Sequence, residues 1–209
     1  MKKEIETKFD VPLELDVNGT LSKLKAIINE EGFSVTASII EHRTFQYYDT
    51  SNLDVYKKGE TIRRVSGFKK GEDKALHRYD FKVGALDDRY EANQWSNDLL
   101  TSPEILERLN LKKFYAVIIP SAFANTQHDK MKLKKDETLI ELTIDYFKVD
   151  EGGEFRELEL ELEHGSASDL KVLSEKIKIN LDLKEINQQK YSRVIESMPK
   201  YRTQVISLS

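Results

Sequence analysis

The chain has 209 residues, no cysteine, and 33 lysine and arginine residues against 37 aspartate and glutamate residues, for a formal net charge of −4. It can therefore form no disulfide and use no thiolate, and it lacks the global basic field that nucleic-acid-binding proteins use. Its first residues are charged rather than apolar, and no apolar run approaches the ~18 residues of a membrane span. We expect a cytoplasmic protein whose partners include neither a nucleic-acid polymer nor a membrane.

The predicted first strand, residues 2–10, alternates charged and uncharged side chains. Because successive side chains of a strand point to opposite faces, Glu4, Glu6 and Lys8 lie on one face. This stripe of two carboxylates and an ammonium fits either a solvent-exposed face or a polar interior.

The rest of the chain divides into strands and helices by the period of its apolar residues. Alternation and turn signals predict strands over residues 33–49, 60–67, 75–84, 88–95, 113–135, 138–149 and 154–163. Helical spacing predicts helices over residues 20–31, 103–110, 167–180 and about 187–197, with Ser102 as the cap of the second. We expect a mainly β (α+β) domain over residues 1–198 and a tail over 199–209. About eight strands favour an antiparallel sheet, which can close into a barrel.

The strand over residues 154–163 alternates glutamate and leucine strictly. Its leucines form an apolar stripe that must be buried, and Glu157, Glu159, Glu161 and Glu163 form the opposite stripe. Neighbouring carboxylates on that stripe are about 7 Å apart, from a rise of ~3.3 Å per residue, so they repel each other unless solvent or a bound cation screens them. An antiparallel sheet with one wetted face gives the same pattern, and for one strand alone that interpretation is the simpler one.

Several other strands repeat this division into an apolar and a charged face. Their charged stripes carry Arg63, Lys82 with Asp80, Arg89 with Glu91, Lys130 with Lys132 and Lys134, and Glu141 with Asp145. A closed barrel of such strands would turn its apolar faces outward, under helices, and its charged faces inward. Buried charges must be paired or bind a metal, Mg²⁺ prefers carboxylate and phosphate oxygens, and lysine and arginine suit phosphates. The pattern predicts a site for a metal–polyphosphate complex.

Glu4-Ile5-Glu6-Thr7-Lys8 is similar to the ExExK signature of the CYTH, or triphosphate tunnel metalloenzyme, superfamily. Further segments resemble the motifs of that superfamily and follow in its order: Tyr47-Tyr48-Asp49-Thr50 with Leu53, Ile62-Arg63, Lys82, Arg89-x-Glu91, Glu141 with Asp145, Glu157-x-Glu159-x-Glu161, and Lys190-Tyr191. The resemblance extends from Glu4 to about Arg193, nearly the whole chain.

The resemblance implies an eight-stranded antiparallel closed barrel, a tunnel with helices packed outside, that binds a small-molecule triphosphate or polyphosphate with Mg²⁺ or Mn²⁺. By position, the implied substrate-binding residues are Lys8, Arg63, Lys82, Arg89 and Lys190. The implied metal ligands are Glu4, Glu6, Glu91, Asp145, Glu157, Glu159 and Glu161, of which Glu4, Glu6 and Glu159 are also the implied catalytic residues. The oligomeric state stays open, with a homodimer as one option.

The sequence also departs from the family pattern. Val65 stands where the family repeats an arginine, and Asn93 replaces an acid. The strand before Glu141 lacks the usual arginine, for which Lys130, Lys132 or Lys134 is a substitute. The histidines are dispersed without paired ligand spacing, which favours surface or structural roles over zinc binding for His42, His77, His128 and His164.

Three functions remain open. The first is a divalent-metal-dependent hydrolase of inorganic triphosphate or another triphosphate-bearing small molecule. The second is a polyphosphate- or nucleotide-binding module without turnover, which the missing arginines favour. The third, an adenylyl cyclase, ranks lower because nothing in the sequence reads a base.

Overall fold

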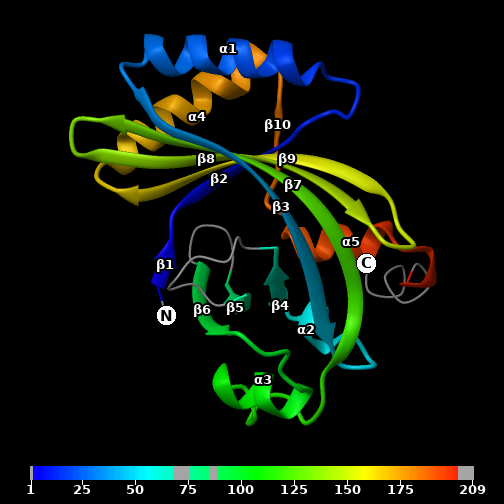
Figure 1. Cartoon of the computed structure of the whole chain (residues 1–209). Coiled ribbons are helices and arrows are strands. Elements are labelled where there is room, and N and C mark those ends of the chain that lie inside the picture. The colour runs from blue at the N-terminus through cyan, green and yellow to red at the C-terminus, as the bar shows by residue number, and fades with distance from the viewer. Residues whose placement is uncertain (1, 68–75, 85–88, 202–209) are drawn as a thin grey trace.

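The computed structural model describes residues 2–67, 76–84 and 89–201, and for residues 2–4, 17–18 and 89 it describes the backbone alone. Most of this chain forms one antiparallel sheet with helices at its outer face and its ends (Figure 1). The prediction of a mainly β protein with helices is confirmed. The single domain over residues 1–198 stays a prediction, and most of the predicted tail lies outside the described residues.

The strands follow one another in the sheet in an order that mixes near and distant parts of the sequence. The order is β1 (Lys2–Glu4), β6 (Arg89–Ser96), β5 (His77–Val83), β4 (Thr61–Ser66), β3 (Ser34–Asp49), β7 (Ile119–Lys135), β8 (Thr138–Val149), β9 (Glu154–His164), β2 (Glu6–Asp10) and β10 (Lys184–Glu185). The helices are α1 (Val17–Glu30), α2 (Asp54–Lys57), α3 (Ser102–Arg108), α4 (Ala167–Leu181) and α5 (Lys190–Ser197), followed by a 3₁₀ turn at Pro199–Tyr201.

The sheet curls strongly, but its pairing differs from the closed eight-stranded barrel that we expected. β1 pairs with β6 and β2 pairs with β9, although only Ile5 separates β1 from β2 in the chain. Within the described ranges, ten strands lie in an order that begins with β1 and ends with β10, and no ladder joins these two. The closed eight-stranded barrel is therefore not confirmed: the described strands form an open order, and the predicted first strand is two strands with different neighbours.

The outer face of the sheet is apolar and lies under two helices. α1 and α4 pack side by side across the strands at the top of Figure 1. The alternating apolar residues of β7, β8 and β9 fill the space between sheet and helices, as the sequence pattern predicts. The buried residues of this layer include Leu24, Ile28, Leu133, Leu142, Leu158, Leu160, Leu173 and Ile177. Since the apolar stripes face these helices, the charged stripes face the inside of the curl.

A second apolar cluster closes the other end of the molecule around α3 and α5. It joins Tyr47 and Tyr79 of the sheet to Ile105 of α3 and Tyr191 of α5. The cap of α3 is Thr101 rather than the predicted Ser102. The Glu104 carboxylate accepts hydrogen bonds of 2.7 Å from both the backbone N–H and the hydroxyl of Thr101, so the first turn begins one residue earlier.

Candidate active site

The inner face of the curled sheet surrounds a charged pocket of about 150 Å³. Every strand from β2 to β9 contributes to its wall, and the start of α5 covers one side. Among the described residues, seven lysines and arginines line it together with five carboxylates: Lys8, Arg43, Arg63, Arg78, Lys82, Lys130 and Lys190, and Glu91, Glu141, Asp145, Glu159 and Glu161. The pocket thus combines many charges in a small volume.

The acidic part of the pocket is built from residues that lie opposite one another on β2, β9 and β8. The strand register produces three rows across these strands: Glu6–Glu161–Glu141, Lys8–Glu159–Thr143, and Asp10–Glu157–Asp145. Cα atoms of directly opposite residues are about 4.5–5.5 Å apart. Three alternating strands therefore combine into one continuous acidic surface.

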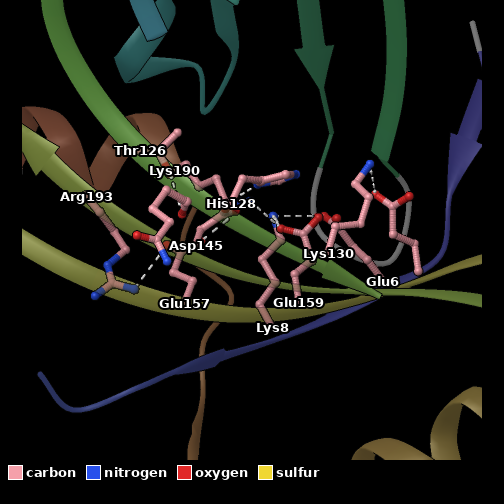
Figure 2. Close-up of polar contacts among 12 residues, drawn as sticks. Glu6, Lys8, Thr126, His128, Lys130, Asp145, Glu157, Glu159, Lys190 and Arg193 are labelled. Atoms are coloured by element: carbon pink, nitrogen blue, oxygen red, sulfur yellow. Dashed lines mark hydrogen bonds and ion pairs between the residues drawn. The ribbon is translucent and has the colours of Figure 1, made fainter. Parts of the chain in front are cut away.

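Lys190 places its ammonium among these acids (Figure 2). Its Nζ lies 2.6 Å from Glu159 Oε2 and 2.7 Å from Asp145 Oδ2, and 3.9 Å from Glu157 Oε2. Burial alone would lower the pKa of Lys190, but the three carboxylates outweigh it and raise the pKa well above its usual range. Lys190 is therefore held as a cation inside the protein.

Lys8 is the second internal cation. Its Nζ lies 3.1 Å from Glu6 Oε1 and 3.6 Å from Glu159 Oε2. Burial would raise the pKa of Glu159, but Lys190 and Lys8 outweigh it and hold the pKa well below the ordinary value. Glu159 is thus ionised while it is largely buried.

Asp145 lies between Lys190 and His128, and Figure 2 shows both side chains directed at its carboxylate. Burial would raise the pKa of Asp145, but Lys190 and His128 lower it instead. His128 itself is buried and lines the pocket. The predicted surface or structural role of this histidine is therefore incomplete, because it forms part of the charged wall.

Glu157 lies behind the pocket wall rather than on it. Its side chain is fully buried, and its Oε1 accepts a 3.0 Å hydrogen bond from Nη1 of Arg193, whose Nη2 donates to Asp10 at 2.6 Å. Burial raises the pKa of Glu157 in spite of the nearby Lys190. Glu157 therefore helps to fix α5 against the sheet.

The basic part of the pocket lies on β3, β4 and β5. The carboxylate of Asp80 accepts a 2.8 Å hydrogen bond from Nε of Arg63 and a 2.7 Å bond from Nε of Arg78. On the same face of β5, Lys82 Nζ lies 3.6 Å from Glu91 Oε2 on β6. Arginines and lysines here outnumber acids, in contrast to the opposite wall.

Most of the residues that the sequence predicts for the site lie together in this pocket. Lys8, Arg63, Lys82, Lys190, Glu91, Asp145, Glu159 and Glu161 line it. Glu6 is buried beside Lys8. Glu4 and Arg89 pair through their backbones across β1 and β6, and their side chains lie outside the description. The roles of all these residues stay predictions.

Sequence reasoning did not assign Arg43 or Arg78 to the site, and it gave Glu141 a place on a charged stripe but no role, although alternation indicates each of them. Arg78 shares the parity of Asp80 and Lys82 on β5, and Arg43 shares that of Phe45 on β3, which also lines the pocket. Parity alone shows that two residues share a face of a strand. It does not show which strands face each other across a cavity.

The carboxylate oxygens of the acidic wall are of the type that binds divalent cations. Glu6, Glu161 and Glu141 meet on neighbouring strands and supply oxygen donors, which Mg²⁺ and Mn²⁺ prefer. In the described ranges, no three histidine, aspartate or glutamate side chains are grouped closely enough to hold a metal ion as they stand. Lysines hold these acids instead, as in the pairs of Lys8 with Glu6 and of Lys130 with Glu141 at 2.8 Å.

No helix in the described part of the chain has both the length and the apolar character needed to cross a membrane. No protein-family model matches the sequence, and no curated protein matches it.

Solved structures match nearly the whole chain at low sequence identity. A candidate adenylate cyclase from Bacillus halodurans is 15% identical, with 92% of this chain and 98% of that chain covered and a TM-score of 0.57. A candidate adenylate cyclase from Vibrio parahaemolyticus is 14% identical, with 93% and 98% covered and a TM-score of 0.54. A candidate adenylyl cyclase from Hippeastrum, described as having a dominant triphosphatase activity, is 12% identical, with 93% and 96% covered and a TM-score of 0.56.

At these identities the likeness concerns the fold. The chain shares its fold with these solved structures, and its place in the CYTH, or triphosphate tunnel metalloenzyme, superfamily stays a prediction from its motifs.

Proposed function

We propose that the protein binds inorganic triphosphate, or a short polyphosphate, in the charged pocket and hydrolyses a phosphoanhydride bond with the help of Mg²⁺ or Mn²⁺. The observation that carries this proposal is the pocket wall, where seven lysines and arginines and five carboxylates from the described residues enclose about 150 Å³. A polyanion supplies the negative charge that a basic wall needs, and a divalent cation suits the acidic wall.

The size of the pocket favours a compact inorganic chain over a nucleotide. Pockets for organic ligands are typically about 300–1,000 Å³ and mostly apolar. Here the volume is about 150 Å³, and Phe45 and Tyr191 are the aromatic side chains of its described wall. A phosphate chain fits such a space, whereas a nucleoside would have to lie outside it. The triphosphatase activity ascribed to the Hippeastrum protein supports this substrate class.

The basic side chains would bind and orient the substrate. Arg63 and Lys82 on one wall and Lys190 on the other would contact its phosphate oxygens, so that the chain is held in line for attack by water. Arg89 is a further candidate for such a contact. Lys8 and Lys190 would exchange part of their present carboxylate contacts for phosphate contacts, which keeps every buried charge paired.

The acidic side chains would hold the metal and the attacking water. Glu4, Glu6, Glu159 and Glu161 are the principal candidates for metal ligands, with Glu91, Asp145 and Glu157 as further candidates. A divalent metal, when bound, would neutralise phosphate charge and lower the pKa of a water molecule. Glu159 is held ionised by its two lysines, so it can accept a hydrogen bond from that water.

The proposal is tested by phosphate release from tripolyphosphate with Mg²⁺ or Mn²⁺. We expect Glu4→Gln and Glu159→Gln to lower kcat about 10²-fold or more, because each removes a carboxylate from the reacting centre. The matched control is Glu163→Gln, at the exposed end of the same acidic stripe, which should keep full activity. Equal rates in all four proteins would refute the proposal.

A polyphosphate-binding module without turnover is the alternative. It is favoured by the lysines that already hold the carboxylates, as in the ion pairs of Lys190 with Asp145 and Glu159. Calorimetric binding of tripolyphosphate without phosphate release would select this function. Production of cyclic AMP from ATP would instead revive adenylyl cyclisation, for which the pocket offers little room.

A further inference from the structure

A buried carboxylate on β5 organises two guanidinium groups of the basic wall. Asp80 is completely buried. Its Oδ1 accepts a 2.7 Å hydrogen bond from Nε of Arg78, and its Oδ2 accepts bonds of 3.0 Å from Nη2 of Arg78 and 2.8 Å from Nε of Arg63. Burial would raise the pKa of Asp80, but Arg63 and Arg78 outweigh it and lower the pKa. Asp80 is therefore a fixed anion that holds both arginines.

These bonds, together with aromatic contacts, determine how the guanidinium planes lie. Asp80 engages Arg63 through Nε, and it engages Arg78 through both Nε and Nη2. The guanidinium carbon of Arg63 lies 4.9 Å from the ring centre of Phe45, and that of Arg78 lies 5.8 Å from the ring centre of Trp95. Stacking of this kind fixes the orientation of a flexible side chain.

Arg43 on β3 brings a third guanidinium to the same wall. Its side chain is 10% exposed, and it lines the pocket with Arg63 and Arg78. Burial is the main cause that lowers the pKa of Arg43, Glu41 opposes it, and the neighbouring Arg78 adds to it. Within the described residues, ion pairs join these three arginines to Asp80 and Glu41, in a largely buried wall that a bound anion would stabilise.

Arg78 also lies beside the position where the family pattern is broken. Val65 on β4 stands directly opposite Arg78 in the strand register. Val65 is fully buried in the apolar cluster around α3 and α5. Arg78 therefore brings a guanidinium to the same row of the sheet as Val65.

We propose that Arg43, Arg63 and Arg78 form a phosphate-binding cluster whose geometry is set by Asp80 as a positioning residue. The inference rests on the proposed function for its ligand class, but it concerns how the anion is bound and not whether it is hydrolysed. This cluster would bind one terminal phosphoryl group of a polyphosphate at the basic wall of the pocket.

Substitution of Asp80 distinguishes the effect of guanidinium orientation on anion binding from the effect of net charge. Asp80→Asn removes one negative charge from beside the pocket, so an effect of charge alone would tighten anion binding. Loss of the carboxylate also releases Arg63 and Arg78 from their present geometry. The proposal therefore expects weaker binding in a pocket that is more positive.

The experiment is calorimetric titration of tripolyphosphate into the full chain, in buffer with chelator and without divalent metal. We expect Arg78→Gln and Asp80→Asn each to weaken binding about 10- to 100-fold, since each removes a charge-assisted contact or its alignment. Arg78→Lys, which keeps the charge but lacks the fork, and Asp80→Glu, which keeps the carboxylate, should fall between these variants and the wild type. The matched control is Arg64→Gln, next to Arg63 on β4 but absent from the pocket wall, which should bind as the wild type does.

The outcomes distinguish this inference from the proposed hydrolysis. An unchanged dissociation constant in Arg78→Gln, tighter binding in Asp80→Asn, or no binding by the wild type would overturn the inference. If Asp80→Asn does not fold, as judged by circular dichroism, the glutamine and lysine variants of the partly exposed Arg78 still test the inference. Binding that depends on these arginines in a protein that releases no phosphate with Mg²⁺ or Mn²⁺ would support the cluster and refute the hydrolase.

Discussion

At the scale of single residues, the pocket depends on cations that are buried among acids. Lys190 is the clearest case, with ion pairs to Asp145 and Glu159 that are almost wholly shielded from solvent. Burial of an isolated ion costs several kcal/mol, and the charge is tolerated because its partners are buried with it. The same residues are therefore candidates for ligand binding and contributors to stability.

Removal of the Lys190 ammonium should destabilise the fold strongly. Lys190→Met leaves the carboxylates of Asp145 and Glu159 buried with one cationic partner fewer, and we expect a loss of about 3–5 kcal/mol in the free energy of unfolding. Urea denaturation measures this change. The control is Lys176→Met. The side chain of Lys176 is exposed, and its pair with Glu31, at an N–O distance of 3.6 Å, should contribute little. Similar stabilities of the two variants would contradict the prediction.

The buried carboxylates determine how the stability of the fold changes at low pH. Folding lowers the pKa of Asp145 and Glu159 below their ordinary values of 3.8 and 4.5, so acidification protonates the unfolded chain first. The contribution of these carboxylates to stability is complete above those values and is lost as the pH falls below them. Glu157 partly offsets the trend, because burial raises its pKa.

Asp145→Asn should therefore flatten the loss of stability between about pH 5 and pH 2. Urea denaturation at a series of pH values measures the slope for the variant and the wild type. An identical slope in the two proteins would show that the Asp145 carboxylate is not one of the groups responsible.

At the scale of elements, α5 is positioned by the segment that resembles the YYDT motif. Asp49 at the end of β3 is completely buried and accepts hydrogen bonds from the backbone N–H groups of Thr50, Val55 and Tyr56, and from the hydroxyl of Tyr191. Tyr191 follows Lys190 in α5. The contact with Asp49 therefore also fixes where the Lys190 ammonium lies.

Tyr191→Phe should weaken this attachment without loss of packing. The ring remains stacked on Tyr47, with centroids 5.0 Å apart, while buried Asp49 loses one of its donors. We expect a loss of about 1–3 kcal/mol in the free energy of unfolding, measured by chemical denaturation. Tyr146→Phe, which removes an exposed hydroxyl, is the control and should change stability little; equal effects would refute the role of Asp49 as an anchor.

Local sequence patterns predicted most of the helices and strands. They were insufficient to predict some of the residues at which these elements begin. The helix over residues 167–180 and the strands over 138–149 and 154–163 agree with α4, β8 and β9 within about one residue. The predicted strand over 113–135 begins only at Ile119, and the cap of α3 moves from Ser102 to Thr101. Ser102 instead accepts a hydrogen bond from the N–H of Ile118, a contact that sequence spacing does not show.

At the scale of the whole molecule, the pocket joins parts of the sheet that are distant in sequence. Lys8 and Glu159 come from its acidic wall, and Arg63 and Lys82 from its basic wall. A ligand that contacts both walls connects β2, β8 and β9 to β4 and β5, and it binds only the folded chain. Ligand binding should therefore stabilise the whole fold rather than one segment.

Tripolyphosphate should raise the free energy of unfolding by about 2.7 kcal/mol at a concentration of 100 times its Kd. Urea denaturation with and without ligand, in buffer containing chelator, measures the shift. The shift should shrink at high ionic strength, because salt screens the charges of the pocket mouth and of the ligand. A shift that does not depend on ligand concentration would exclude a specific site.

The sequence by itself determined the two faces of each strand, the helices that cover the apolar face, and the order of the charged motifs, because these follow from local geometry with a period of two or 3.6 residues. Only the tertiary structure decided which charges meet. The register places Arg78 opposite Val65 and Arg63 opposite Asp80, and the break at Ile5 gives β1 and β2 different neighbours. The curl of the sheet then brings the acidic wall opposite the basic wall. Register and curvature depend on the packing of the entire sheet, so no single segment of the sequence could specify the site.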